Sequence, residues 1–215
     1  MVIQECINGV PVELETENYY FSRSGVDCGT LFMLQTVFGA TDGTADAKAV
    51  STEKVLDLGC GYGVVGIYVK KAFPDARVVM LDVEEDAVKL SEQNLQRNGL
   101  EGVSVIRNDG LKAYPEREFS LILSNPPFHT DFSVAKEFIE DGFKALKTGG
   151  SMVMVTKRRT WYENKLKTVF GGVRVTEKDG YFVFVSEKRP RKPVRQMPAP
   201  AMSKKLARKM RRGKG

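Results

Sequence analysis

Short apolar runs alternate with helical patterns between residues 54 and 156, and this alternation leaves few folds open to the chain. Alternating strands and helices are typical of a parallel sheet covered by helices. The predicted strands are Val55 to Leu58, Arg77 to Leu81, Val103 to Arg107, Phe119 to Ser124, Met152 to Thr156, Val173 to Glu177 and Tyr181 to Val185. The predicted helices are Thr30 to Phe38, Val64 to Phe73, Glu84 to Arg97, Phe132 to Lys147 and Trp161 to Phe170. We therefore expect an α/β fold with a seven-stranded, mostly parallel sheet.

Two short dipeptides predict tight turns near the ends of the folded part. Asn8-Gly9 and Asp179-Gly180 tolerate the positive φ angles of hairpin turns. The first predicts an N-terminal β-hairpin from Val2 to Leu14, and the second makes the last two strands antiparallel. We divide the chain into a hairpin extension (1–18), a main domain (19–187) and a basic tail (188–215).

Composition excludes some classes of protein. With 215 residues, 42% of them hydrophobic, the chain has enough apolar residues to bury a substantial core. No apolar run approaches the roughly 20 residues of a membrane span. The start, Met1 to Glu5, lacks the features of a signal peptide, so we expect a cytoplasmic location without a membrane. Cys6, Cys28 and Cys60 lack metal-ligand spacing, and we predict buried hydrophobic roles for them and no metal.

The positive charge is concentrated in the tail. Residues 188–215 hold 12 Lys and Arg and no Asp or Glu, which leaves 21 basic and 27 acidic residues in 1–187. A cationic arm on an acidic body favours contact with phosphate backbones. The proline-rich composition predicts disorder for the tail. The alternatives are a solubilising arm or contact with a membrane surface.

A glycine-rich turn follows the first predicted strand of the sheet. Asp57 precedes Gly59, Gly61 and Gly63, which allow a tight strand-to-helix turn and close approach of a ligand. An acid at this strand end would repel a pyrophosphate and attract an amino group, which favours S-adenosylmethionine over a dinucleotide. The alternative is that Asp57 is only a strand-end residue.

Polar residues also end the next two strands, where ligands bind in such sheets. Asp82 is placed to accept hydrogen bonds from ribose hydroxyls, although nicotinamide enzymes use the same device, and Val83 follows it in the predicted cofactor site. Asn108 and Asp109 are candidates for the adenine amino group. The alternatives are a helix N-cap for Asp82 and a turn residue for Asp109.

The run Asn125-Pro126-Pro127-Phe128 follows an apolar strand and predicts the reaction. The Asn125 side-chain oxygen and the Pro126 carbonyl are two acceptors for both hydrogens of a flat NH2 group. Phe128 is placed to stack on the ring that carries this group. These four residues are the predicted catalytic residues, and Asn125 is also assigned to cofactor binding.

These motifs, in this order and spacing, resemble the class I S-adenosylmethionine-dependent methyltransferases, specifically the bacterial ribosomal RNA guanine-N2 methyltransferase family. The resemblance spans about Tyr20 to Lys188 and implies a Rossmann-like fold, S-adenosylmethionine as cofactor and S-adenosylhomocysteine as product. Phe21-Ser22 with Asp27-x-Gly29-Thr30 resembles a family segment that packs near the methionine end of the cofactor, and Phe21, Asp27 and Gly29 are assigned to cofactor binding. Members often carry a second methyltransferase-like domain ahead of the catalytic one, whereas we expect only a hairpin there, so the sequence resembles the short, single-domain branch of the family.

Basic and aromatic residues near the motif indicate how a substrate would bind. His129, Lys157 and Arg158 are predicted to contact RNA, together with Phe128. His129 is alternatively a general base or a structural residue, and Trp161 and Tyr162 alternatively pack their helix against the sheet. We expect methylation of a guanine 2-amino group in RNA, with ribosomal RNA or a ribosomal subunit as partner. The alternatives are adenine N6, a protein glutamine amide, or a non-catalytic RNA-binding assembly factor.

Overall fold

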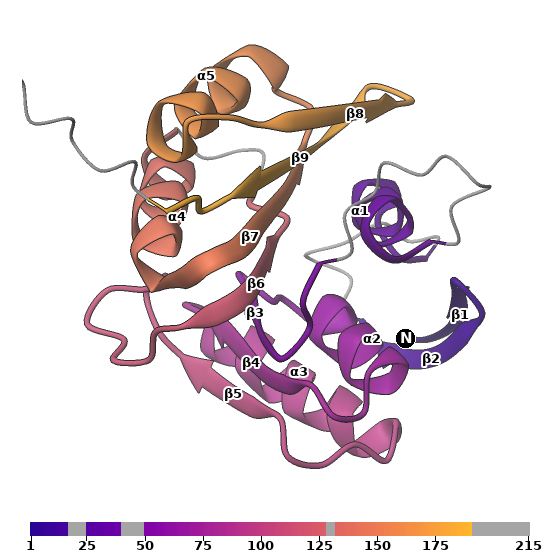
Figure 1. Cartoon of the computed structure of the whole chain (residues 1–215). Helices are drawn as coiled ribbons and strands as arrows, with labels where there is room; N and C mark the ends of the chain where they lie inside the picture. The colour runs from indigo at the N-terminus through magenta and orange to yellow at the C-terminus, as the bar shows by residue number, and fades with distance from the viewer. Residues whose placement is uncertain (17–24, 40–49, 128–131, 191–215) are drawn as a thin grey trace, which may run out of the picture.

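A computed structural model describes residues 1–16, 25–39, 50–127 and 132–190. Within them, seven strands form one sheet in the order β5-β4-β3-β6-β7-β9-β8, and β1 pairs with β2 in a separate hairpin (Figure 1). The strands from β5 to β7 run parallel, and β9 is antiparallel to both β7 and β8. The predicted α/β, Rossmann-like fold with its N-terminal hairpin is confirmed.

The elements have the following bounds. The strands are β1 (Val2–Ile7), β2 (Val10–Glu15), β3 (Lys54–Leu58), β4 (Arg77–Asp82), β5 (Ser104–Arg107), β6 (Phe119–Ser124), β7 (Leu146–Thr156), β8 (Arg174–Lys178) and β9 (Tyr181–Glu187). The helices are α1 (Cys28–Phe38), α2 (Val64–Ala72), α3 (Glu85–Arg97), α4 (Phe132–Ala145) and α5 (Arg159–Phe170).

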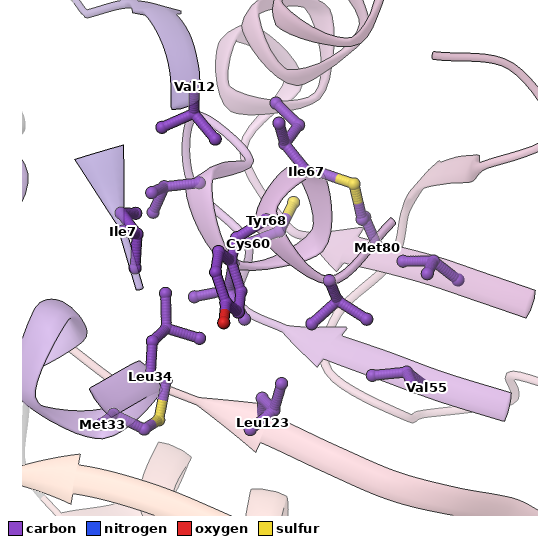
Figure 2. Close-up of a cluster of buried hydrophobic side chains, with 14 of the residues drawn as sticks. Ile7, Val12, Met33, Leu34, Val55, Cys60, Ile67, Tyr68, Met80 and Leu123 are labelled. Carbon is purple, nitrogen blue, oxygen red and sulfur yellow. The ribbon is translucent and has the colours of Figure 1, made fainter. Parts of the chain in front are cut away.

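The sheet lies between two apolar clusters, because side chains of a strand alternate between its faces. In β3, Val55 belongs to the cluster under α1, α2, α3 and the hairpin, whereas Leu56 belongs to the cluster under α4 and α5. Figure 2 shows part of the first cluster, where Val12 of the hairpin lies beside Ile67 of α2, and Ile7 and Leu34 lie near Tyr68 of the same helix. The hairpin is therefore part of the domain's core.

Asn94 of α3 ties the hairpin to the rest of the domain. This fully buried side chain accepts from the Glu15 amide at 2.6 Å and donates to the carbonyls of Glu15 and Tyr62, each at 2.9 Å. Asn98, one turn later, accepts from the Glu13 amide and donates to the Glu13 carbonyl. The exposed backbone edge of β2 is thus paired by two asparagine side chains.

The predicted end of the fourth helix is wrong. The helix stops at Ala145 rather than Lys147, and β7 begins at Leu146 rather than Met152. Leu146 is fully buried and pairs with Phe119, and the register then shifts before Ser151 pairs with Leu121. Gly149 and Gly150, which follow the predicted helix and form an ordinary helix stop signal, lie instead within β7, where the Gly149 amide donates to the Lys188 carbonyl at 2.7 Å.

Two smaller expectations also need correction. The first helix begins at Cys28 rather than Thr30, because the Asp27 side chain caps it by accepting from the Thr30 amide. Cys60 is buried as predicted, but Cys6 and Cys28 are exposed. Cys6 lies on an outward-facing position of β1, and Cys28 lies in the first turn of α1.

Among the described residues, no helix is both long and apolar enough to cross a membrane.

Candidate active site

The candidate site lies where the direction of winding of the sheet reverses. From β3 the chain adds β4 and β5 on one side, and it then returns to add β6 on the other side of β3. Ligands in open α/β sheets bind beyond the carboxyl ends of the strands at this switch point. Ser124 at the end of β6 donates to the Leu58 carbonyl at 2.8 Å, which holds the two strand ends together.

The glycine-rich turn after β3 has the conformation that its sequence predicts. Gly59, Gly61 and Gly63 have φ angles of 76°, 56° and 89°, a region that favours glycine. The amides of Gly59 and Cys60 donate to the Leu81 carbonyl of β4. A Cβ at Gly63 would lie 2.7 Å from the Met80 Cε atom. The turn therefore requires glycine both for its backbone angles and for its packing against β4.

Asp57 is a buried carboxyl group directly beneath this turn. Its Oδ2 atom accepts from the Gly66 amide in the first turns of α2 at 2.9 Å. Burial raises the pKa of Asp57 to about 7, the negative charge of Asp82 acts in the same direction, and the Gly66 hydrogen bond opposes both. Asp57 therefore has a structural contact of its own, and its predicted contact with an amino group stays a prediction.

Asp82 organises the same turn from the end of β4. Its Oδ2 accepts from the Gly61 amide at 2.8 Å and its Oδ1 from the Glu84 amide at 3.0 Å, just ahead of α3. Each carboxylate oxygen can accept a second hydrogen bond, so these contacts are compatible with the predicted ribose contact. Val83 beside it is 49% exposed, which is unusual for a large apolar residue in this structure.

Asn108 and Asp109 after β5 make local contacts. Asn108 Nδ2 donates to the carbonyls of Gly110 and Lys112 at 2.9 and 3.1 Å, and Asp109 pairs with the Lys112 ammonium at 2.9 Å. These contacts fit the turn alternative for Asp109. The predicted contacts of both residues with adenine stay predictions.

Asn125 directly follows β6, and the two polar atoms of its side chain differ in their hydrogen bonding. Its Nδ2 donates to Asp27 Oδ2 at 3.0 Å and to Thr30 Oγ1 at 2.9 Å. Its Oδ1 is buried, and it is the one buried side-chain nitrogen or oxygen among the described residues without a hydrogen-bond partner. Amide orientation is assigned from hydrogen bonding, and the opposite orientation would place Oδ1 against the Asp27 carboxylate. Asn125 thus holds a buried acceptor that no described group satisfies.

The segment around Asp27 contacts Asn125, and its place near the methionine end of the cofactor stays a prediction. Gly29 packs so tightly on β9 that a Cβ there would lie 2.7 Å from the Tyr181 ring. Tyr181 Oη lies 3.4 Å from Asp27 Oδ1, to which it donates. Thr30 and Tyr181 were not among the predicted site residues. Thr30 belongs to the segment that the resemblance marks, although no role was assigned to it, whereas no sequence signal marks Tyr181, which lies in an ordinary strand pattern.

Basic side chains follow β7, which pairs with β6, the strand that precedes Asn125. The Lys157 ammonium lies 4.6 Å from the centre of the Tyr181 ring, and the Arg158 guanidinium lies 5.0 Å from that of Phe132. Phe132 stacks on Trp161 with ring centres 4.4 Å apart. Lys157 and Arg158 are exposed, which is compatible with their predicted contact with RNA.

The remaining predicted residues divide into described and undescribed ones. Pro126 is buried and Pro127 exposed. Phe21, Phe128 and His129 lie outside the described residues. Tyr162 is 4% exposed and stacks on Phe184 of β9, as its alternative role in packing the helix predicted.

Comparison with protein families gives a match over most of the chain. Residues 11–186 match the model of the methyltransferase small domain family. Ribosomal RNA small subunit methyltransferase C of Pseudomonas putida (strain GB-1) is 36% identical over 179 residues, which cover 81% of this chain and 50% of that protein. Ribosomal RNA large subunit methyltransferase G of Klebsiella pneumoniae subsp. pneumoniae is 31% identical over 193 residues, covering 86% of this chain and 49% of that protein.

A solved structure has the same fold. The T. thermophilus 16S rRNA N2 methyltransferase RsmC, in complex with AdoMet and guanosine, superposes with a TM-score of 0.75 and 27% identity. The match covers 88% of this chain and 50% of that one. The chain thus spans about half the length of the curated relatives it matches.

Proposed function

Because the chain belongs to the methyltransferase small domain family, we propose that it transfers a methyl group from S-adenosylmethionine to the 2-amino group of a guanine in ribosomal RNA. The similar proteins are named as ribosomal RNA methyltransferases of both subunits. The similar T. thermophilus protein is named for N2 methylation and was solved with guanosine. Guanine N2 is therefore the favoured acceptor.

The unused Asn125 Oδ1 carries this proposal. A buried acceptor without a partner costs about 1 to 3 kcal/mol, so it is retained where a ligand supplies the missing donor. Because Nδ2 is occupied by Asp27 and Thr30, the group facing the site is an acceptor and not a donor. An exocyclic amino group is such a donor, whereas a ring carbonyl is not.

The Pro126 carbonyl would supply the second acceptor, one residue further along the motif. Together, Asn125 Oδ1 and the Pro126 carbonyl would bind both amino hydrogens and hold the nitrogen in line with the methyl group. Two acceptors on these hydrogens favour a pyramidal nitrogen, whose lone pair is then directed at the methyl carbon. Orientation of this kind supplies roughly 7 to 11 kcal/mol in the best model systems. No strong base is then needed, and Phe128 would stack on the guanine.

The residues at the carboxyl ends of β3 and β4 are suited to hold S-adenosylmethionine. The turn from Gly59 to Gly63 brings backbone close to the switch point, and exposed Val83 offers an apolar surface beside Asp82. Asp82 would bind the ribose, Asp57 the amino group, and Asn108 and Asp109 the adenine. The bound cofactor supplies a methyl group activated by a positive sulfur.

Lys157 and Arg158 would bind RNA phosphates beside the acceptor base, and the basic tail would add contacts that do not depend on sequence. His129 would line the acceptor pocket. Ribosomal RNA as partner implies a cytoplasmic location for the protein.

The test is methylation of ribosomal RNA with isotopically labelled S-adenosylmethionine. The RNA is taken from a strain lacking the protein, both free and in subunits, and its nucleosides are analysed by mass spectrometry. Labelled N2-methylguanosine is the expected product. Label in N6-methyladenosine would show that the acceptor base is adenine and not guanine. Absence of label from RNA would overturn the proposal.

Two variants show whether the motif carries the reaction. Asn125→Ala should abolish turnover even at saturating S-adenosylmethionine, because the lost acceptor serves the substrate whatever Asn125 adds to cofactor binding. Asn164→Ala changes an exposed asparagine on α5 in the same way and should retain full activity.

A further inference from the structure

The first turn of α1 contacts Asn125 across 98 positions of sequence. Asp27 Oδ2 and Thr30 Oγ1 both accept from Asn125 Nδ2, at 3.0 and 2.9 Å. Thr30 is 4% exposed, so water has little access to compete for its hydroxyl group. The amide nitrogen of Asn125 therefore has two protein acceptors, one of which carries negative charge.

We propose that Thr30 and Asp27 are positioning residues that fix the orientation of the Asn125 amide, so that Oδ1 rather than Nδ2 faces the substrate. The inference rests on the proposed function, since it explains why the oxygen of the Asn125 amide, rather than its nitrogen, would face the amino group of the substrate. The Asp27 carboxylate disfavours the flipped orientation because it can only accept, whereas the Thr30 hydroxyl, which can donate or accept, adds a second acceptor for Nδ2 in the observed orientation. In the flipped orientation, Nδ2 would face the amino group of the substrate, and two donors would meet.

The position of Asp27 is itself fixed from two sides. Its Oδ2 accepts from the Thr30 amide at 3.0 Å, which caps α1, and its Oδ1 accepts from Tyr181 Oη of β9 at 3.4 Å. Gly29 lets the Tyr181 ring approach this closely. The carboxylate is thus held between a helix start and a strand, and it cannot turn away from Asn125 without losing these contacts.

Thr30 offers the cleanest test, because valine has nearly the same shape and lacks the hydroxyl group. Thr30→Val should lower kcat about tenfold, since a net hydrogen bond of roughly 1.4 kcal/mol corresponds to a factor of ten. Thr30→Ser keeps the acceptor and should retain kcat within about threefold. Thr36→Val makes the same substitution on α1 where the hydroxyl donates to the Phe32 carbonyl, and it should leave kcat unchanged.

The affinity for S-adenosylmethionine and the melting temperature are measured on every variant. We expect Thr30→Val to keep both near the wild-type values while kcat falls, a separation that general loss of structure would not produce. Equal kcat in Thr30→Val and wild type would overturn the inference. Equal losses in Thr30→Val and Thr30→Ser would overturn it as well, because the hydroxyl group would then have no special role.

A measurement without turnover separates this inference from the proposed function. The side-chain NH2 signals of Asn125 can be identified in nitrogen-15 spectra as those missing from Asn125→Asp. They should exchange with water slowly in the wild type and about tenfold faster in Thr30→Val. Fast exchange in the wild type would overturn the inference even if RNA is methylated. Slow exchange with no methylation of RNA would overturn the proposed function alone.

Discussion

Binding of S-adenosylmethionine should release a proton from Asp57. This carboxyl is buried under the glycine-rich turn, and burial raises its pKa to about 7. At pH 6 such a group is protonated in about 90% of molecules. The amino group of the ligand is then a cation, because ordinary α-amino groups have pKa values of roughly 7.7 to 8.0. A cation placed beside Asp57 would favour its ionised form.

The expected magnitude follows from these values. Binding at pH 6 should release about 0.9 proton, and binding at pH 8 about 0.1 from the same group. Below pH 7 the affinity for the ligand should accordingly increase as the pH increases, by up to about tenfold per pH unit. Asp57→Asn keeps an acceptor for the Gly66 amide and removes the proton, so its binding at pH 6 should release none.

Calorimetric titration in buffers of different ionisation enthalpy measures this proton directly. Adenosine serves as control ligand because it lacks the amino acid portion, and it should bind without proton release at pH 6. The reasoning would be refuted if wild type and Asp57→Asn released the same number of protons. In that case the ligand's amino group would not lie beside Asp57.

The same pKa shift has a consequence for the protein without ligand. Because the folded pKa lies above the ordinary value of 3.8, the folded state binds the extra proton, and stability is lost as pH rises from about 4 to 7. Relative to Asp57→Asn, the wild type should lose at most about 4 kcal/mol of unfolding free energy over this range. Urea unfolding of both proteins at pH 5 and pH 7.5 should show roughly 2.5 kcal/mol of this loss.

Two other perturbations test the hairpin and the tail. Asn94→Ala removes a fully buried side chain with three hydrogen bonds to backbone, one of them buried and two part-buried, and should lower the unfolding free energy measured in urea by about 3 kcal/mol. Asn98→Ala, at a half-buried position, should cost less, and equal losses would contradict the role assigned to burial. Removing residues 189–215 should weaken RNA binding and flatten its salt dependence without changing affinity for the cofactor, and unchanged RNA affinity would exclude the tail as an RNA contact.

Features encoded locally were predictable from the sequence. The strands and the glycine turn are examples, because side-chain period and glycine angles are properties of neighbouring residues. Asn125 could be selected because an asparagine before two prolines after a buried strand has a chemical meaning on its own. The exposed positions of Cys6 and Cys28, by contrast, depend on which faces the hairpin and α1 turn outward, and the isolated sequence carries no such signal.

The end of α4 was missed for a related reason. A helical pattern followed by Gly149-Gly150 is an ordinary stop signal, yet the strand takes over earlier, at Leu146. Leu146 pairs with Phe119, and the Gly149 amide donates to the Lys188 carbonyl. Both partners lie far away in sequence. Tertiary pairing therefore overrides the local preference of these residues, and it also draws Lys188, predicted to begin the tail, into contact with the sheet.

The hydrogen bond between Asp27 and Asn125 could not be predicted from either motif, although both residues were predicted to belong to the site. It requires α1 to pack against β7 and β9, which brings its first turn to the end of the neighbouring β6. One carboxylate oxygen then serves two purposes, since it caps α1 and accepts from the Asn125 amide. Replacing Asp27 would therefore cost both helix stability and amide orientation, and a loss of activity would not distinguish them. Thr30 touches Asn125 through a hydroxyl group that serves no cap, so substitution there separates orientation of the amide from stability of the helix.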